Sequence, residues 1–179
     1  LGLEDVKKRA KKMSLLEPYE LARLIEKKSV PYVIGPQGEI YIVDHHHLCR
    51  ALWSIGQKKA VLGKELADWS DLEVKEFWRR MDKNGYCWAI DSQGHRRPYS
   101  AIPKHISDLT DNVWRSLARA IRGDAFTNQD TPFQEFIWGD YFRTFMAQRL
   151  LEHDFELAKK IAKHIAHFKE AEDLPGYKL

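Results

Sequence analysis

One short stretch of the chain gathers four side chains that could bind an anion or a metal ion: Asp44, His45, His46 and His47. The β-rich residues 39–43 before it predict a strand, and the spacing of leucines after it predicts a helix. The first amides of a helix lack partners and together carry about half a positive charge, so phosphates bind well there. Imidazoles would add hydrogen-bond donors, and the Asp44 carboxylate could hold a metal ion or orient a histidine. We therefore interpret this strand-to-helix junction as a candidate phosphate site.

Two other interpretations of this junction compete with the phosphate site. In the plainest one, Asp44 is the N-cap of the helix and the histidines are solvated. That would suffice for a single Asp-His pair, but four such residues at one junction favour a site. Structural zinc is disfavoured, because adjacent side chains on a helix point in different directions and no pair of histidines four residues apart stands here.

A row of arginines in the second half of the chain is another candidate anion site. Arg115, Arg119 and Arg122 are spaced so that they share one face of a predicted helix. A row of guanidinium groups suits phosphates or carboxylates. Alternatively, the row is an exposed face that pairs with acids of a neighbouring helix, such as Glu135 and Asp140. The sequence favours neither interpretation over the other.

Capping residues, glycines and prolines mark the elements that would position these side chains. Capping-box sequences at residues 14–17 and 70–73 predict two helix starts, and Thr131-Pro132 predicts a third. The Gly/Pro turn at residues 35–38 lies between two β-rich runs and predicts a hairpin. The predicted helices cover residues 5–13, 14–28, 46–55, 70–84, 111–123, 132–152 and 154–170, and the predicted strands cover 30–34, 39–43 and 59–62.

The order of these elements predicts an α+β fold. A small α+β module would cover residues 1–83, and a mainly helical part packed on it would cover residues 84–179. A module of about eighty residues has a marginal core, so we expect the two parts to share one. Helical spacing also puts Val74 and Leu157 on the buried sides of their helices.

Composition narrows the class of protein without naming a function. The 179 residues are 44% hydrophobic and 31% charged, which excludes intrinsic disorder, collagen and a disulfide scaffold. No apolar run is long enough to span a membrane, so we expect no membrane partner. The net charge of +3 lies mostly in residues 7–12 and neither indicates nor excludes nucleic-acid binding. Two cysteines favour a reduced, cytoplasmic setting. The sequence begins at Leu1 rather than Met, so whether another segment precedes it stays open.

The residues around the junction resemble a known superfamily. Val43-Asp44-His45-His46, followed by a helix with Ala51-Leu52, is similar to the ParB/sulfiredoxin superfamily, whose members carry a Gly-His-Arg-like box there. Residues 34–38 followed by 44–47 resemble the central motif of the putative ParB-like nuclease family. Later blocks of that family resemble residues 77–78, 114–122, 132–138 and 174–177. The resemblance covers nearly the whole chain and implies a ParB/sulfiredoxin-like small mixed sheet with helices, followed by a mainly helical C-terminal part.

The superfamily also implies a chemistry for the junction. Its free serine kinases place nucleotide phosphates at this helix and carry a Pro-His-Glu whose Glu takes a proton from the substrate hydroxyl. Pro18-Tyr19-Glu20 is similar, so the resemblance implies Glu20 as a base and Asp44 as a ligand of Mg²⁺. The nucleotide would be ATP, ADP or CTP, and its phosphates would contact His45, His46, His47 and Arg50, with Arg115 and Arg119 as further anion-binding candidates.

Some residues depart from these relatives. His45 replaces a Gly of the kinase box and crowds the approach of a phosphate, and Leu48 replaces its Arg, although Arg50 follows two residues on. Cys49 lies in the helix body, so we do not expect sulfiredoxin chemistry. A second Gly-His-Arg sequence, at residues 94–97, lacks a strand before it and a helix after it, and we interpret it as a loop.

Three functional hypotheses follow. The first is a kinase-like phosphotransferase with Glu20 as base. The second is a nuclease, in which Asp44 and a histidine activate water. The third is a non-catalytic module that binds DNA or a protein partner through the basic residues 7–12 and the Arg115 row. The sequence leaves the oligomeric state open.

Overall fold

The computed structural model describes residues 2–57, 60 and 62–178, which fall into two compact units. The first, here called the sheet unit, contains residues 3–89 and 97–110. The second, here called the helical unit, contains Gly2, residues 90–96 and the chain from residue 111 onward. The division at residue 83 with a shared core stays a prediction.

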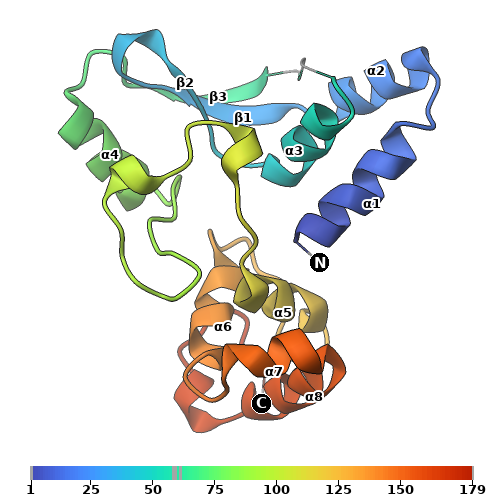
Figure 1. Ribbon diagram of the computed structural model, residues 1–179. Helices are drawn as coiled ribbons and strands as arrows, with labels where there is room; N and C mark the ends of the chain where they lie inside the picture. The colour runs from blue at the N-terminus through green and yellow to red at the C-terminus, as the bar shows by residue number, and fades with distance from the viewer. Residues whose placement is uncertain (1, 58–59, 61, 179) are drawn as a thin grey trace. The chain divides into compact units, whose positions relative to one another are not determined.

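A three-stranded mixed sheet forms the centre of the sheet unit (Figure 1). Its order is β2-β1-β3, with β1 at Val30–Ile34, β2 at Ile40–Ile42 and β3 at Leu62–Asp68. β1 and β2 form the predicted antiparallel hairpin, closed by a turn in which Gln37 has a φ of 63°. β3 runs parallel to β1, which requires a crossover, and helix α3 (His46–Ser54) supplies it. Of the predicted strand at 59–62, residues 59 and 61 lie outside the described residues, and β3 continues well beyond Leu62.

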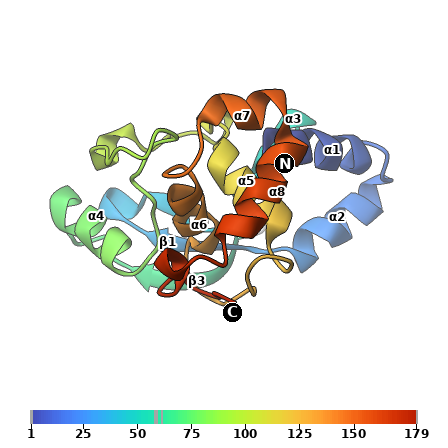
Figure 2. The same ribbon diagram turned by 90° about the horizontal axis from the view of Figure 1, so that it is seen from below.

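Helices flank β1 on both sides in this unit. Figure 1 and Figure 2 both show α1 (Leu3–Met13), α2 (Pro18–Lys27) and α3 to one side and α4 (Val74–Lys83) to the other. On the first side, the apolar faces of the three helices form one cluster. On the other side, Phe77 and Met81 of α4 pack on Val33 of β1. The buried residues of the first cluster are Val6, Ala10, Met13, Ile25, Leu48, Ala51 and Leu52.

Two predicted helix starts in this unit were wrong. α2 begins at Pro18, and its capping box joins Glu17 to Glu20, whereas the Ser14 hydroxyl donates to the Lys11 carbonyl at the end of α1. A Glu at the N-cap with Pro after it can start a helix as Ser14 was expected to. The start of the helix moves by four residues, and its apolar face is unchanged. α4 begins at Val74, whose side chain is 57% exposed rather than buried.

The helical unit contains α5 (Val113–Ile121), α6 (Gln134–Phe142), α7 (Gln148–His153) and α8 (Phe155–Ile165). The single helix predicted over 132–152 is wrong, because residues 143–147 separate α6 from α7 and the Thr144 hydroxyl donates to the Tyr141 carbonyl at 2.8 Å. α8 ends at Ile165, short of residue 170, and its buried face is Ala158, Ala162 and Ile165, which leaves Leu157 44% exposed. The aromatic centre of this core is Trp138, stacked on Phe126 at 4.3 Å.

These elements confirm the predicted α+β class: a small mixed sheet with helices, followed by a mainly helical C-terminal part. In the part of the chain that the structure describes, no helix combines the length and the apolar character that crossing a membrane would require.

Candidate functional site

The start of α3 is held in an uncommon backbone conformation. Its N-cap residue is His45, with φ 62° and ψ 21°, and the His45 side chain provides no cap. The interpretation of Asp44 as the N-cap is therefore wrong. The Asp44 carboxylate instead accepts the His45 amide at 2.6 Å. The first-turn amides of a helix have no acceptor within it, and the side chain of the N-cap residue supplies none here.

His45 adopts a left-handed conformation that favours glycine. Such a φ costs a residue with a Cβ roughly 1–3 kcal/mol. Its ring is partly buried, and Nδ1 has no hydrogen-bond partner among the described residues. Both features are unfavourable for folding, and strain of this kind is concentrated at functional sites.

His46 occupies the first turn and is held neutral by its surroundings. Burial lowers the pKa of the His46 imidazole, and this effect exceeds the opposing influences of the Asp44 charge and a hydrogen bond to the Ile42 carbonyl. Because one ring nitrogen donates to Ile42, the other can accept a proton or a hydrogen bond. His47 follows it in the same turn and is also partly buried.

Arg50 lies one turn after His46 and makes a contact that the sequence did not predict. Its Nη1 donates to the Ile106 carbonyl at 3.1 Å, and its guanidinium lies 5.2 Å from the Trp53 ring centroid. Arg50 therefore anchors the short turn Ile106–Asp108 on α3, where Figure 1 shows it in yellow. At least one of its donors is thereby committed to the protein's own backbone.

Segment 97–110, which contains this turn, is attached at both ends within the sheet unit. At its beginning, the Tyr99 ring stacks on Trp78 at 5.7 Å and its hydroxyl donates to Asp82 at 2.7 Å. The exposed side chains of Lys104 and His105 directly precede the turn on α3. Sequence analysis missed these basic candidates, because the segment has no periodicity that would attach it to a particular helix.

Glu20, the candidate base, has a structural role in α2. Its Oε2 accepts the Glu17 amide at 3.1 Å, which closes the capping box of the helix. The side chain is exposed and takes part in this cap.

The arginine row belongs to the helical unit, whereas residues 44–50 belong to the sheet unit. Arg119 and Arg122 approach Glu135 at 3.7 and 2.7 Å, and Arg115 lies 6.0 Å from the Phe136 ring centroid. Glu135 thus acts as the acid partner that the alternative interpretation required. The other expected acid, Asp140, pairs with Arg143 at 2.8 Å instead.

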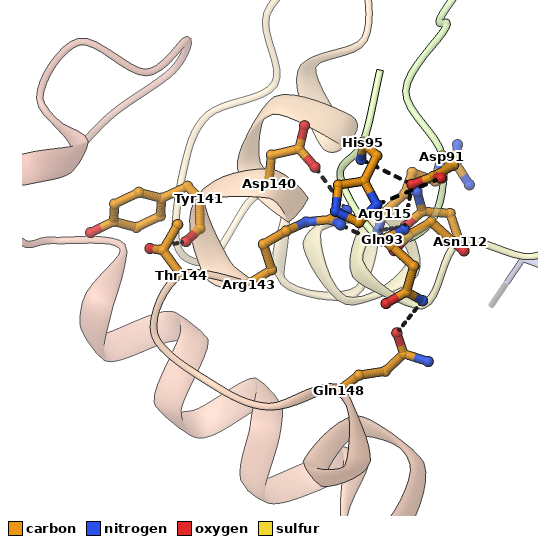
Figure 3. Close-up of polar contacts among 11 residues, drawn as sticks. Asp91, Gln93, His95, Asn112, Arg115, Asp140, Tyr141, Arg143, Thr144 and Gln148 are labelled. Carbon is orange, nitrogen blue, oxygen red and sulfur yellow. Dashed lines mark hydrogen bonds and ion pairs between the residues drawn. The ribbon is translucent and has the colours of Figure 1, made fainter. Parts of the chain in front are cut away.

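The second Gly-His-Arg sequence forms the predicted loop, and its residues 94–96 belong to the helical unit (Figure 3). The Asp91 carboxylate accepts the amides of Gln93 and His95, both at 2.9 Å. Arg143 donates to the Ser92 carbonyl at 3.1 Å. The polar side chains here hold a turn in place, so the motif has a structural explanation.

At the start of α3, a metal ion would be held by Asp44. In residues 2–57, 60 and 62–178, no three His, Cys, Asp or Glu side chains gather closely enough to hold an ion. Mg²⁺ commonly binds through one or two carboxylates together with substrate phosphates. Asp44 therefore fits an ion that arrives with a nucleotide. Cys49 offers little thiolate, because burial raises the pKa of its thiol.

Comparison with known proteins places this geometry in context. A family model described as "Putative ParB-like nuclease" matches residues 1–144, which include every candidate residue above. Among solved structures, the crystal structure of protein Atu1540 from Agrobacterium tumefaciens is similar over 99% of this chain and 88% of that one, with 36% identity and a TM-score of 0.85. No curated protein matches the chain.

Proposed function

The chain belongs to the putative ParB-like nuclease family, and from that premise we propose that it binds the phosphates of a nucleotide at the start of α3. The observation that carries the proposal is the N-terminus of this helix. It begins with a strained His45 whose side chain provides no cap, and the partly buried imidazole of His46 belongs to its first turn. Helix amides and the helix dipole attract phosphate, and imidazoles at that point add donors.

Each residue would have a distinct part in binding. A bound phosphate is an anion, so it raises the pKa of His46, which would take up a proton and donate to a phosphate oxygen. His45 and His47 would supply further donors. Mg²⁺ bound with the nucleotide would neutralise phosphate charge, with Asp44 holding it.

The proposal extends from phosphate binding to catalysis at the same site. In phosphoryl transfer, Glu20 would accept the proton of an acceptor hydroxyl. In phosphodiester cleavage, Asp44 and one of the histidines would activate water. The cap at Glu17 favours the second route, because it gives Glu20 a task that needs no substrate.

Thermal unfolding in the presence of nucleotides tests the binding proposal. We expect ATP, ADP or CTP with Mg²⁺, at about 100 times its Kd, to stabilise the protein by about 2.7 kcal/mol. His46→Ala should abolish this gain, whereas His164→Ala, an exposed imidazole of the helical unit, should retain it. The proposal fails if no nucleotide raises the melting temperature, or if both variants respond like the wild type.

A second candidate, DNA binding, is favoured by the surface of α1. Val6, Ala10 and Met13 are buried, so the opposite face of the helix carries exposed Lys8, Arg9, Lys11 and Lys12. Four phosphate contacts would make duplex affinity fall roughly a hundredfold between about 50 and 200 mM salt. Fluorescence anisotropy of a labelled duplex would measure this, and Lys8→Glu with Lys12→Glu should flatten the salt dependence. Equal binding by the variant would exclude α1 as the DNA surface.

A further inference from the structure

The helical unit has an apolar groove of about 640 Å³ that none of the hypotheses above uses. α7 forms one wall of it, and Ile161 of α8 forms another part. The lining residues are Phe145, Met146, Ala147, Arg149, Leu150, His153 and Ile161. All of them follow residue 144, where the family match ends, so the groove lies outside the residues that the family model matches.

Large hydrophobic side chains are exposed at this groove and beside it. Phe145 is 43% exposed, and the rings of Tyr141 and Phe168 pack against it at 5.0 and 5.9 Å, which fixes its position. Leu157 is 44% exposed and lies one helical turn before Ile161 on the same face of α8. An exposed apolar patch with a concave floor is typical of a surface that binds another molecule.

The ionisable side chains that line the groove are basic. Arg149 and His153 line it, and the exposed Lys160 is next to Ile161 in α8. Across the described residues, neither Arg149 nor His153 takes part in an ion pair, and no acid lines the groove. Glu152, the nearest acid in α7, lines a different pocket and accepts from Gln148 at 2.8 Å. Positive charge at the rim of an apolar floor is complementary to a ligand with apolar anchors and acidic flanks.

We infer that this groove docks an amphipathic α-helix of a partner protein whose polar face is acidic. Apolar side chains spaced three and four residues apart would fill the groove and cover Phe145 and Leu157. Flanking Asp or Glu residues would pair with Arg149, His153 and Lys160. The apolar floor distinguishes this surface from a nucleic-acid site, where cationic groups would track a phosphate backbone. The inference is independent of the phosphate site proposed above.

Two synthetic peptides provide the test. Each has about 18 residues and the same leucine face, spaced for a groove-binding helix. The polar face of one consists of Glu and that of the other of Lys. We expect fluorescence anisotropy with the full chain to show that the Glu peptide binds at least about tenfold more tightly than the Lys peptide.

Variants of exposed residues in the groove and beside it locate the binding. Arg149→Glu should weaken the Glu peptide about tenfold and strengthen the Lys peptide. Leu157→Glu should abolish binding of the Glu peptide, with circular dichroism checking that α8 persists. Lys75→Glu, the same charge change on an exposed position of α4 in the sheet unit, is the control and should bind like the wild type.

Several outcomes would overturn the inference. If the Glu peptide fails to bind, or if both peptides bind with equal affinity, the basic groups of the groove do not select an acidic partner. Equal losses in Arg149→Glu and Lys75→Glu would show that net charge rather than the groove governs binding. Displacement of the Glu peptide by a DNA duplex, with the same sensitivity to Arg149→Glu, would assign the surface to nucleic acid.

Discussion

Arg50 of α3 donates from Nη1 to the backbone carbonyl of Ile106, 56 residues further along the chain, at 3.1 Å. The resemblance to kinases implies that Arg50 contacts phosphate, whereas this hydrogen bond makes it the anchor of segment 97–110. A guanidinium has five donors, so one bond does not exhaust it. The two roles nevertheless predict different consequences when the guanidinium is removed.

Arg50→Met keeps the apolar stem of the side chain and removes its donors. As an anchor, Arg50 stabilises the fold, and its loss leaves the partly buried Ile106 carbonyl unpaired at a cost of about 1–3 kcal/mol. We expect urea denaturation to show that decrease in the free energy of unfolding, with only a small change in nucleotide affinity. Unchanged stability with a large loss of affinity would instead make Arg50 a phosphate ligand.

Substitutions of Glu20 separate capping from catalysis. Gln can close a capping box as Glu does, so Glu20→Gln should leave the free energy of unfolding nearly unchanged. Glu20→Ala removes the acceptor of the Glu17 amide and should cost about 0.5–2 kcal/mol. Any phosphotransfer activity that is found should survive Glu20→Gln if the residue is only a cap. Loss of turnover in a stable Glu20→Gln protein would identify Glu20 as the base.

The lowered pKa of His46 makes stability depend on pH. In the unfolded chain this imidazole takes up a proton near its ordinary pKa of 6.5, whereas in the fold it does so only at lower pH. The stability contributed by neutral His46 is therefore present above pH 6.5 and is lost as pH falls through the folded pKa, with a slope of at most about 1.4 kcal/mol per pH unit.

Comparing the wild type with His46→Gln isolates this dependence, because the other titrating groups are common to both proteins. We expect the wild type to lose more stability than the variant between about pH 7 and 5. Urea denaturation across that range measures the difference, and an NMR titration of the imidazole gives the direction of the pKa directly. Parallel pH profiles would contradict the burial of a neutral His46.

What the sequence could predict depends on how local each determinant is. The hairpin, the start of α3 at the histidines and the Asn112 start of α5 follow from a few neighbouring residues, and the structure confirms them. The break between α6 and α7 was missed, because the helical apolar spacing continues through residues 143–147. Long-range contacts such as Arg50 with Ile106 had no signal at all. The sequence identified the candidate residues at the start of α3, but the left-handed conformation of His45 depends on the fold. The pairing of Arg119 and Arg122 with Glu135 also depends on the fold.

His45→Gly tests whether the start of α3 is strained. Glycine adopts a φ of 62° without steric cost, whereas His45→Ala keeps the strain and loses the ring. We therefore expect the Gly variant to be more stable than the Ala variant by about 1 kcal/mol. Both variants lack the imidazole, so equal weakening of nucleotide binding in the two would show that the ring contributes donors. If the Ala variant is as stable as the Gly variant, the backbone is not strained in solution.

Gly94→Ala tests the polar cluster that holds the turn at residues 91–95. A Cβ on Gly94, whose φ is +85°, would lie 2.7 Å from Nη1 of Arg143. That guanidinium cannot move freely, because it is bonded to Asp140 and to the Ser92 carbonyl and lies over the Trp114 ring. We expect Gly94→Ala to lower the free energy of unfolding by about 2–3 kcal/mol, from backbone strain together with the displaced guanidinium.

Gly123→Ala is the matched control for this change. Gly123 has a φ of +96°, but a Cβ there meets no atom within 4 Å, so only the backbone strain of about 1 kcal/mol applies. The excess loss in Gly94→Ala over Gly123→Ala then measures the collision with Arg143. In the background of Arg143→Ala, this excess should disappear, because the atom that the new methyl meets is gone. If the excess persists in that background, the turn is destabilised by its own backbone and Arg143 does not hold it.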